Sequence, residues 1–308
     1  MGDEVGVSTQ LNEGWAYRER LGPDAEGQTL LAYLSRRYAH STPEEWAGRI
    51  SAGLVHLDGG VGCAESVLYR GSELVWERPP WVEPEAPRSF AVLYEDEDLL
   101  AVAKPAGLPT LPGANFLQGT LLYQVQAYAP DAAPVHRLGR WTSGVVLCAR
   151  NYASRTSLTR QWSGREIGKH YRALASGVPG WEELEITTPI GPVPHLLLGT
   201  IHAASPAGKA AWSRVMVRQR GAEDFLCDVE IATGRPHQIR IHLAAAGHPL
   251  VGDPLYTSGG LPAPDSRAVP GDPGYLLHAA ELYFAHPRSG SAMAIVCEPP
   301  APLRLAAG

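Results

Sequence analysis

The chain has 308 residues and a mass of 33.1 kDa, a length that suits two domains. Hydrophobic residues make up 44% of it and charged residues 19%, as in globular proteins with a sizeable core. No run approaches about eighteen consecutive apolar residues, and the acidic N-terminus lacks an apolar stretch, which excludes a membrane span and a secretory signal. The cysteines show no CxxC spacing, which argues against a zinc site and a disulfide scaffold and predicts a reducing, cytoplasmic location: Cys63, Cys148, Cys227 and Cys297.

The net charge of −6, from 26 Lys and Arg against 32 Asp and Glu, argues at first against a phosphate backbone as partner. The excess acid is not spread evenly. Residues 1–85 carry 7 Arg against 14 Asp and Glu, a net of −7, whereas residues 86–308 carry 19 against 18, a net of +1. The charge of the longer part therefore does not exclude nucleic acid.

The composition changes near residue 80. Residues 77–89, ERPPWVEPEAPRS, hold four prolines and cannot continue a helix, so they predict a linker or an extended crossover. We therefore expect a small accessory module over residues 1–85 and a main domain over residues 86–308.

The leading segment begins with two helical patterns. Apolar residues recur at helical spacing over residues 29–38, and Thr42-Pro43 is typical of a helix start. Residues 53–60 and 66–76 resemble short strands around a Gly-Gly turn. This is a module of the size that some enzymes carry to bind RNA, and any small α+β accessory domain fits the same local pattern.

In the main domain, strand-like and helical runs alternate without a repeat, which predicts an α+β fold with a mixed sheet. Expected strands cover residues 98–104, 144–150, 171–177, 212–219 and 225–233. Expected helices cover residues 119–129, 151–162 and 237–247, and residues 258–274 are expected to form an exposed loop. No GxGxxG or GxxxxGK[ST] motif is present, so nucleotide-cofactor folds are unsupported.

The densest polar cluster is residues 136–144, HRLGRWTSG, directly before an apolar strand. A histidine and two arginines beside glycines could cradle phosphate, with Thr142 and Ser143 as hydroxyl donors. A solvated loop before a strand is the alternative interpretation.

A second cluster, residues 233–242, reads TGRPHQIRIH. Pro236 suits the first position of a helix, which would place free backbone N–H groups beside Arg235 and His237, with His237, Arg240 and Ile241 on one face. The alternatives are an anion site and a capped helix with surface charges. The spacing of the histidines in and after this cluster does not stack metal ligands on one helical face, so no metal is expected.

Two further residues stand at strand ends. Lys104 closes a strand and could reach a phosphate, although such a residue more often only ends the strand. Tyr171 begins another strand and points to the face opposite His170, where a tyrosine usually belongs to the core.

Taken in order, six blocks resemble the RNA pseudouridine synthases of the RluA type over residues 92–287, nearly the whole main domain. The blocks are EDEDLLAVAKPAGLPTLP, HRLGRWTSGVVLCAR, KHYRALASG, GKAAWSRVMV, TGRPHQIRIHLAAAGHPLVGDPLY and LLHAAELYFAHP. The leading module, with GLVHLDG and PPWVEP, more faintly resembles the small RNA-binding domain that often precedes the catalytic one. Its net charge of −7 departs from the basic face expected of an RNA binder.

The resemblance implies an isomerase that converts uridine to pseudouridine in structured RNA, rRNA or tRNA, without cofactor or metal, as a cytoplasmic monomer. The target base must leave its stack at a cost of a few kcal/mol. The family pattern makes Tyr171 the aromatic that packs on the flipped base and assists its proton transfer. It makes Arg240 the first choice, and Arg235 the second, for the buried arginine that orients the catalytic carboxylate. The other expected RNA-binding residues are Lys104, His136, Arg137, Arg140, Thr142, Ser143, Arg235, His237 and Gln238.

The sequence departs from the family at one position. The family motif reads HRLD, and its aspartate acts at the ribose as nucleophile or base, whereas this chain has Gly139 there. Losing such a group typically costs on the order of 10⁴–10⁶ in rate. Three hypotheses follow: an active enzyme with a carboxylate from elsewhere, an inactive RNA-binding relative, and an enzyme acting on small molecules in the same cleft. Candidates for the replacement carboxylate are Asp131, Asp228 and, weakest, Asp253.

Overall fold

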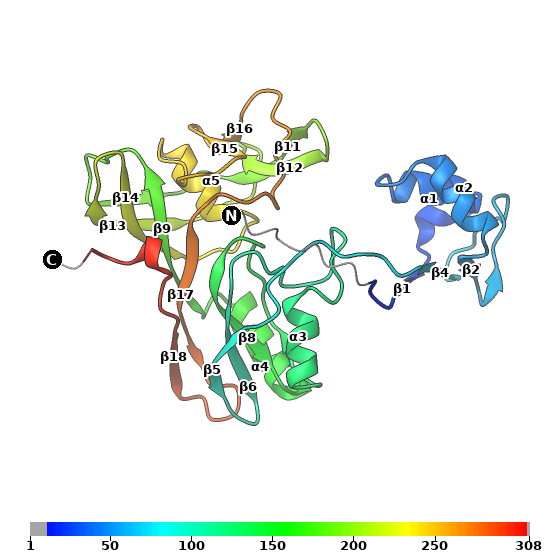
Figure 1. The fold of residues 1–308 in the computed structure, drawn as a ribbon, viewed down its shortest axis with the longest axis horizontal. Helices are drawn as coiled ribbons and strands as arrows, with labels where there is room; N and C mark the ends of the chain where they lie inside the picture. The colour runs from blue at the N-terminus through cyan, green and yellow to red at the C-terminus, as the bar shows by residue number, and fades with distance from the viewer. Residues whose placement is uncertain (1–10, 307–308) are drawn as a thin grey trace, which may run out of the picture. The chain divides into compact units, whose positions relative to one another are not determined.

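The computed structural model describes residues 11–306, and the chain divides into two units, residues 1–83 and 84–308 (Figure 1). The boundary expected from the proline-rich segment was 85/86. Within the described residues, no helix is both long and apolar enough to cross a membrane.

The first unit has two helices packed on a four-stranded antiparallel sheet, whose strand order is β1-β4-β2-β3. Thr42 caps α2 in a capping box with Glu45, with a proline directly after the cap, as the sequence predicted. Trp46 of α2 is buried with Leu30 and Leu34 of α1 against the sheet, which gives this unit its own core. Its elements are β1 (Trp15–Arg20), η1 (Pro23–Ala25), α1 (Leu30–Arg37), α2 (Pro43–Ser51), β2 (Val55–Leu57), β3 (Gly60–Val61) and β4 (Glu73–Arg78).

The second unit is built on a ten-stranded sheet with the order β10-β13-β14-β9-β17-β8-β6-β5, in which β18 also pairs with β17 and β7 with β8. Two small two-stranded sheets, β11–β12 and β15–β16, accompany it. The strands are β5 (Ala91–Glu95), β6 (Leu99–Lys104), β7 (Ala133–Pro134), β8 (Ser143–Ala149), β9 (Gly168–Ser176), β10 (Glu183–Ile186), β11 (Ile190–His195), β12 (Gly199–Ala204), β13 (Ser213–Arg220), β14 (Asp224–Ile231), β15 (Tyr256–Thr257), β16 (Leu261–Pro262), β17 (Leu277–Ala285) and β18 (Ala292–Val296). The helices are α3 (Leu121–Tyr128), α4 (Tyr152–Ser163), α5 (Gln238–Ala245) and η2 (Ala301–Leu303).

The sheet is mixed, as predicted, because β8 and β17 run parallel while the other described pairs run antiparallel. Gly144 makes the parallel contact possible. A Cβ at this position would lie 2.1 Å from the carbonyl oxygen of Ala279, and φ is +112°. Only glycine tolerates both the close approach and this backbone conformation.

The two faces of β8 carry different helices. Val145 and Leu147 pack in one core cluster with Leu158 of α4. Val146 and Cys148 point the other way and pack in a second cluster with residues of α3. Tyr171 of β9 packs against this second cluster and against the one that contains Ile239 of α5, so the face bearing α3 is the face of the candidate site.

Helix α5 begins later than the sequence predicted. Pro236 stands before the helix, and His237 is its N-cap in a left-handed conformation with φ 54°, so His237 does not share a helical face with Arg240. Seven of the eight residues of α5 are buried. It is therefore a core helix, and the interpretation as a helix with surface charges is wrong.

Candidate functional site

The first motif loop, residues 136–142, joins β7 to β8. Leu138 is buried and fixed by Thr110, whose hydroxyl donates to the Leu138 carbonyl at 3.0 Å and accepts from its amide at 3.2 Å. The amide of Thr142 donates to the carbonyl of Gly139 at 3.1 Å, which closes a tight turn. Gly139 therefore lies at the start of a well-held turn, and it is exposed there.

Lys104 supports this loop from inside the protein. Its side chain is 1% exposed, and its ammonium donates to the carbonyls of Leu108 at 2.7 Å, Pro105 at 2.9 Å and Arg140 at 3.0 Å. Desolvation, with repulsion from Arg140, lowers the pKa of Lys104 to about 7. All three donors are used within the protein, so the structure places Lys104 beneath the loop and leaves it no donor for a phosphate.

His136 also lies within the loop's framework. Its ring stacks on Trp162 with 4.3 Å between centroids, and its Nε2 accepts the amide of Leu147 at 2.9 Å. Burial, with the charge of Lys169, lowers the pKa of His136 to about 3. It is thus a neutral ring that joins the motif to α4 and β8.

The two arginines of the loop have different surroundings. Arg140 is half-buried, donates to the carbonyls of Gly107 at 3.0 Å and Glu85 at 3.2 Å, and holds its guanidinium 4.5 Å from the Phe116 ring centroid. Arg137 is exposed. The loop thus offers one positive side chain to solvent and uses the other mainly to hold its own shape.

Two hydroxyl residues stand at the end of the loop and the start of β8, and both contact residues in or just before β17. His278 Nε2 donates to the carbonyl of Cys297 at 3.0 Å, so its Nδ1 accepts from the Ser143 hydroxyl at 2.8 Å. Thr142 is 4% exposed, and its hydroxyl lies 3.4 Å from the hydroxyl of Tyr275. Ser143 therefore has an internal partner, whereas Thr142 faces the site.

The second motif, residues 233–242, is held by Gln238. Its amide oxygen accepts from the Thr233 hydroxyl at 2.7 Å and from the Arg235 amide at 3.0 Å, and its amide nitrogen donates to Ser213 and Trp212. Gln238 is 3% exposed, so it shapes the loop from inside. A hollow of about 350 Å³ lies beside this loop, with His202, Lys209 and Arg235 among its lining residues.

His237 contacts the core at the entrance to α5. The hydroxyl of Tyr256 donates to the carbonyl of His202 at 2.7 Å, so it accepts from His237 Nδ1 at 2.7 Å. Burial, followed by the charge of Arg240 and with a smaller effect of Arg137, lowers the pKa of His237 to about 3. Tyr275 links the two motifs, because its ring centroid lies 4.1 Å from the Arg240 guanidinium and its hydroxyl 3.4 Å from that of Thr142.

Arg240 is buried and paired with Asp253. Their side chains are 2% and 0% exposed, and the guanidinium donates to both carboxylate oxygens at 2.6 and 2.8 Å. It also donates to the carbonyl of Pro270 at 3.0 Å and lies 4.1 Å from the ring centroid of Tyr275. The arginine chosen from the sequence is thus buried, as expected, and the carboxylate that it orients is Asp253.

Tyr171 is half-buried in the sheet face that carries these residues. It packs against the cluster that contains Leu138 and against the one that contains Tyr275 and Ile239. Burial raises the pKa of Tyr171 to about 12, so its phenol is neutral at physiological pH. Tyr171 thus packs against core clusters to which residues of both motifs belong: Leu138, Trp141 and Ile239.

Tyr275 was not predicted as a site residue. A Cβ built on Gly139 would lie 2.9 Å from the Tyr275 hydroxyl and 3.3 Å from the Thr142 hydroxyl. A sequence pattern could not find this contact, because 136 positions separate the two residues and Tyr275 lies outside every motif.

The candidate replacement carboxylates lie elsewhere or are already paired. Asp228 pairs with Arg172 at 2.6 Å, and Arg172 faces the side of the sheet opposite Tyr171. Asp131 is exposed in the loop before β7. Asp253 comes nearest through Arg240, but its Oδ1 also accepts the amides of Leu255 and Tyr256. None of these three is a free carboxylate at Gly139.

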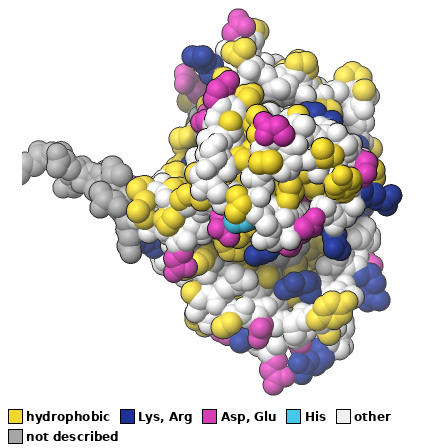
Figure 2. Space-filling model, turned by 90° about the vertical axis from the view of Figure 1, so that its right-hand side faces the viewer, with side chains coloured by type: hydrophobic (Ala, Val, Ile, Leu, Met, Phe, Trp, Pro, Cys, Tyr) yellow, Lys and Arg dark blue, Asp and Glu magenta, His cyan; other side chains and the backbone are white. Residues whose placement is uncertain are grey.

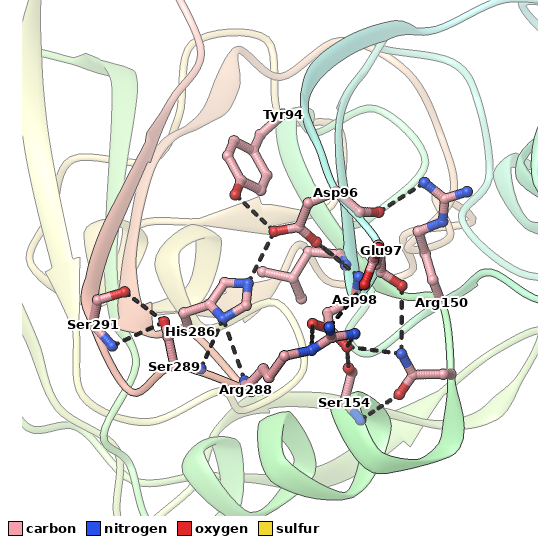
Figure 3. A network of polar contacts seen from close by, with 12 residues as sticks. Tyr94, Asp96, Glu97, Asp98, Arg150, Ser154, His286, Arg288, Ser289 and Ser291 are labelled. Carbon is pink, nitrogen blue, oxygen red and sulfur yellow. Dashed lines mark hydrogen bonds and ion pairs between the residues drawn. The ribbon is translucent and has the colours of Figure 1, made fainter.

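A separate polar network joins the β5–β6 turn to the β17–β18 turn (Figure 3). Ligand-type atoms of Asp96, Asp98 and His286 lie within 4.8 Å of one another. However, His286 Nε2 donates to Asp96 at 2.9 Å, and Arg288 lies 2.6 Å from Asp98. Because these charges already have partners, we assign the network to holding the two turns together.

On the face shown in Figure 2, Lys and Arg side chains lie among Asp, Glu and apolar side chains.

Comparison with known proteins agrees with the arrangement of these motifs. The family model described as RNA pseudouridylate synthase matches residues 98–245. The chain is 41% identical to RNA pseudouridine synthase 5 of Arabidopsis thaliana, over 89% of each protein. It is 43% identical to an uncharacterised RNA pseudouridine synthase of Synechocystis, over 83% of this chain and 89% of the relative.

Further relatives include ribosomal large subunit pseudouridine synthase D of Neisseria meningitidis, 36% identical over 85% of this chain and 72% of the relative. Among solved structures, human RNA pseudouridylate synthase domain containing 1 superimposes with a TM-score of 0.54 at 25% identity, over 70% of this chain and 86% of that one. The second unit therefore has the α+β pseudouridine synthase fold, and the chain belongs to the RNA pseudouridine synthase family.

Proposed function

We propose that this chain isomerises uridine to pseudouridine in structured RNA, rRNA or tRNA, and acts as a monomer in the cytoplasm. The observation that carries the proposal is that Tyr171 packs against core clusters shared by both motifs, and that Tyr275 links Arg240 to the turn at Gly139. The relatives described above, which are named RNA pseudouridine synthases, support the same reaction.

In this proposal each group has a physical task. Arg137 and Arg235, at the two motif loops, contact the RNA backbone. The neutral phenol of Tyr171 packs on the uracil after it leaves its stack. Arg240 is a positioning residue, because it is buried. Its guanidinium pairs with the Asp253 carboxylate and packs against the ring of Tyr275. The reaction requires no cofactor.

The second candidate is an RNA-binding relative without turnover, and Gly139 favours it. Glycine offers no group to attack or deprotonate the ribose, and the carboxylates considered above are exposed elsewhere or paired. Loss of the catalytic nucleophile typically costs on the order of 10⁴–10⁶ in rate. In this case the cleft would bind or remodel RNA without isomerising the base.

Mapping of pseudouridine in RNA from a deletion strain separates the two candidates. The strain is complemented with the native gene, with Gly139→Asp, and with Gly139→Asp combined with Tyr275→Leu, which makes room for the new side chain. We expect a site to disappear on deletion and to return with the native gene.

Matched protein levels in the complemented strains serve as the control. A pseudouridine map unchanged by the deletion, with a site that appears only with a gene that carries Gly139→Asp, would favour the inactive relative. A pseudouridine map unchanged by the deletion would contradict isomerisation as the function of the native protein.

A further inference from the structure

Tyr275 occupies the space that a side chain at position 139 would need. Its hydroxyl lies 2.9 Å from the ideal Cβ position of residue 139, closer than real Cβ contacts allow. Tyr275 is 4% exposed and its ring is held against the Arg240 guanidinium at 4.1 Å, so it cannot easily move aside. Glycine at 139 and tyrosine at 275 therefore fit each other.

The Tyr275 hydroxyl also has unused hydrogen-bonding capacity. Buried hydroxyl groups normally bond a partner oxygen at about 2.7–2.8 Å. Its hydrogen-bond contact is Thr142 at 3.4 Å, near the limit for such a bond. Gly139 is exposed, and its ideal Cβ position lies 2.9 Å from this hydroxyl, so a ligand group placed against Gly139 would come close to the Tyr275 hydroxyl.

We propose that the Tyr275 hydroxyl, with Thr142 beside it, contacts the ribose of the bound nucleotide in this chain. The inference rests on the proposed function, because the resemblance to the family places the group at position 139 opposite the ribose. A phenol hydroxyl both donates and accepts, so it can bond to a ribose 2′-hydroxyl, which deoxyribose lacks. Tyr275 would thus make the site selective for ribonucleotides.

The first experiment tests the geometry without requiring activity. Gly139→Ala is made in the native protein and in a Tyr275→Phe background, and thermal unfolding is measured. We expect Gly139→Ala to lower the Tm by about 2–5 °C in the native protein and by much less in the Tyr275→Phe protein, where the oxygen is gone. Gly180→Ala is the matched control, since its Cβ would meet nothing within 4 Å. Equal losses in both backgrounds would overturn the proposed fit.

The second experiment tests the ribose contact. Binding of poly(U) and poly(dU) is measured at low salt for the native protein and for Tyr275→Phe. The control variant is Tyr283→Phe, since Tyr283 lies in β17 and is 41% exposed. We expect the native protein and the control to bind poly(U) more tightly than poly(dU). In Tyr275→Phe the ratio of the two affinities should fall by about 3- to 10-fold, which corresponds to the loss of one hydrogen bond. An unchanged preference in Tyr275→Phe would contradict the proposal.

These two readouts separate the inference from the proposed function. If deletion leaves the pseudouridine map unchanged, isomerisation fails as the native activity, and the poly(U) preference still decides the role of Tyr275. If the native protein forms pseudouridine, Tyr275→Phe should lower its formation at least about tenfold. Full activity of Tyr275→Phe would overturn the ribose contact.

Discussion

Several polar residues of the motifs form hydrogen bonds inside the protein that hold its loops in place. Lys104, His136 and Gln238 were expected at the RNA, yet each places its hydrogen-bonding atoms on backbone or buried partners. Their bonds fix the loops that present Arg137 and Arg235. Polar residues of a motif can thus serve to hold its loops in place.

Replacing Lys104 with methionine tests this supporting role. Lys104→Met keeps the length of the side chain but leaves the carbonyls of Pro105, Leu108 and Arg140 without their donor. We expect the free energy of unfolding to fall by about 2–4 kcal/mol in a urea titration. The exposed Lys209→Met is the control and should change it little. A Lys104→Met protein as stable as the native one would show that the ammonium does not hold the loop.

The residues differ in how far sequence could predict them. The absence of a carboxylate at Gly139 follows directly from the motif, and the burial of Arg240 was expected. The contact between Gly139 and Tyr275 was not predictable, because it depends on how the segment before β17 passes beside the loop before β8. The pairing of Arg240 with Asp253 was not predictable either, because it depends on how the segment after α5 folds back against that helix.

At the scale of elements, the predicted strands and helices of the second unit were found within a few residues, because their apolar runs are strong. Helix α5 is the instructive difference: the left-handed His237 and the bonds of Gln238 delay its start to Gln238. The central strand β17 was not predicted as a strand. The hairpin of β11 and β12 was missed as well, since β11 contains two prolines that normally argue against a strand.

The turns of β5–β6 and β17–β18 give a pH prediction. Burial opposes ionisation of Asp96, but hydrogen bonds from Tyr94, the amides of Asp98 and Leu99, and His286 together lower its pKa to about 2, from 3.8. A carboxyl whose pKa is lower in the folded state stabilises the fold above its unfolded pKa and loses this effect as the pH falls. The native protein should therefore exceed Asp96→Asn in stability at pH 6, and the difference should shrink between about pH 4 and pH 2.

Urea titrations of both proteins between pH 6 and pH 3 measure this difference. Glu97→Gln is the control, because Glu97 is exposed and its contact with Arg288 is a surface ion pair. A stability difference between native and Asp96→Asn that stays constant as the pH falls would contradict the assigned role of Asp96.

At the scale of the whole molecule, charge differs between the two units. Residues 1–83 carry 7 Arg against 13 Asp and Glu, a net of −6, and residues 84–308 carry 19 Lys and Arg against 19 Asp and Glu. Affinity for RNA depends on how many cations meet phosphates, and each such contact adds about 0.7–0.9 to the slope of log affinity against log salt.

Removal of residues 1–83 tests whether the acidic unit contacts RNA. We expect residues 84–308 to bind ribosomal RNA from the deletion strain with the same salt slope as the full chain, because the unit contributes more negative than positive charge. Filter binding across a range of salt concentrations measures the slope. If removal of residues 1–83 lowered the salt slope by about one or more, the acidic unit would be assigned contacts with phosphates.

The position of β17 has a consequence for biosynthesis. This strand begins 101 positions after β9 ends, yet it fills the gap between β8 and β9 in the middle of the sheet. While the ribosome is still translating earlier codons, both flanking strands have an open edge that can pair with another nascent chain. The sheet can close only after β17 has been translated, so a premature stop codon before Leu277 would give an aggregation-prone fragment instead of a shorter working protein.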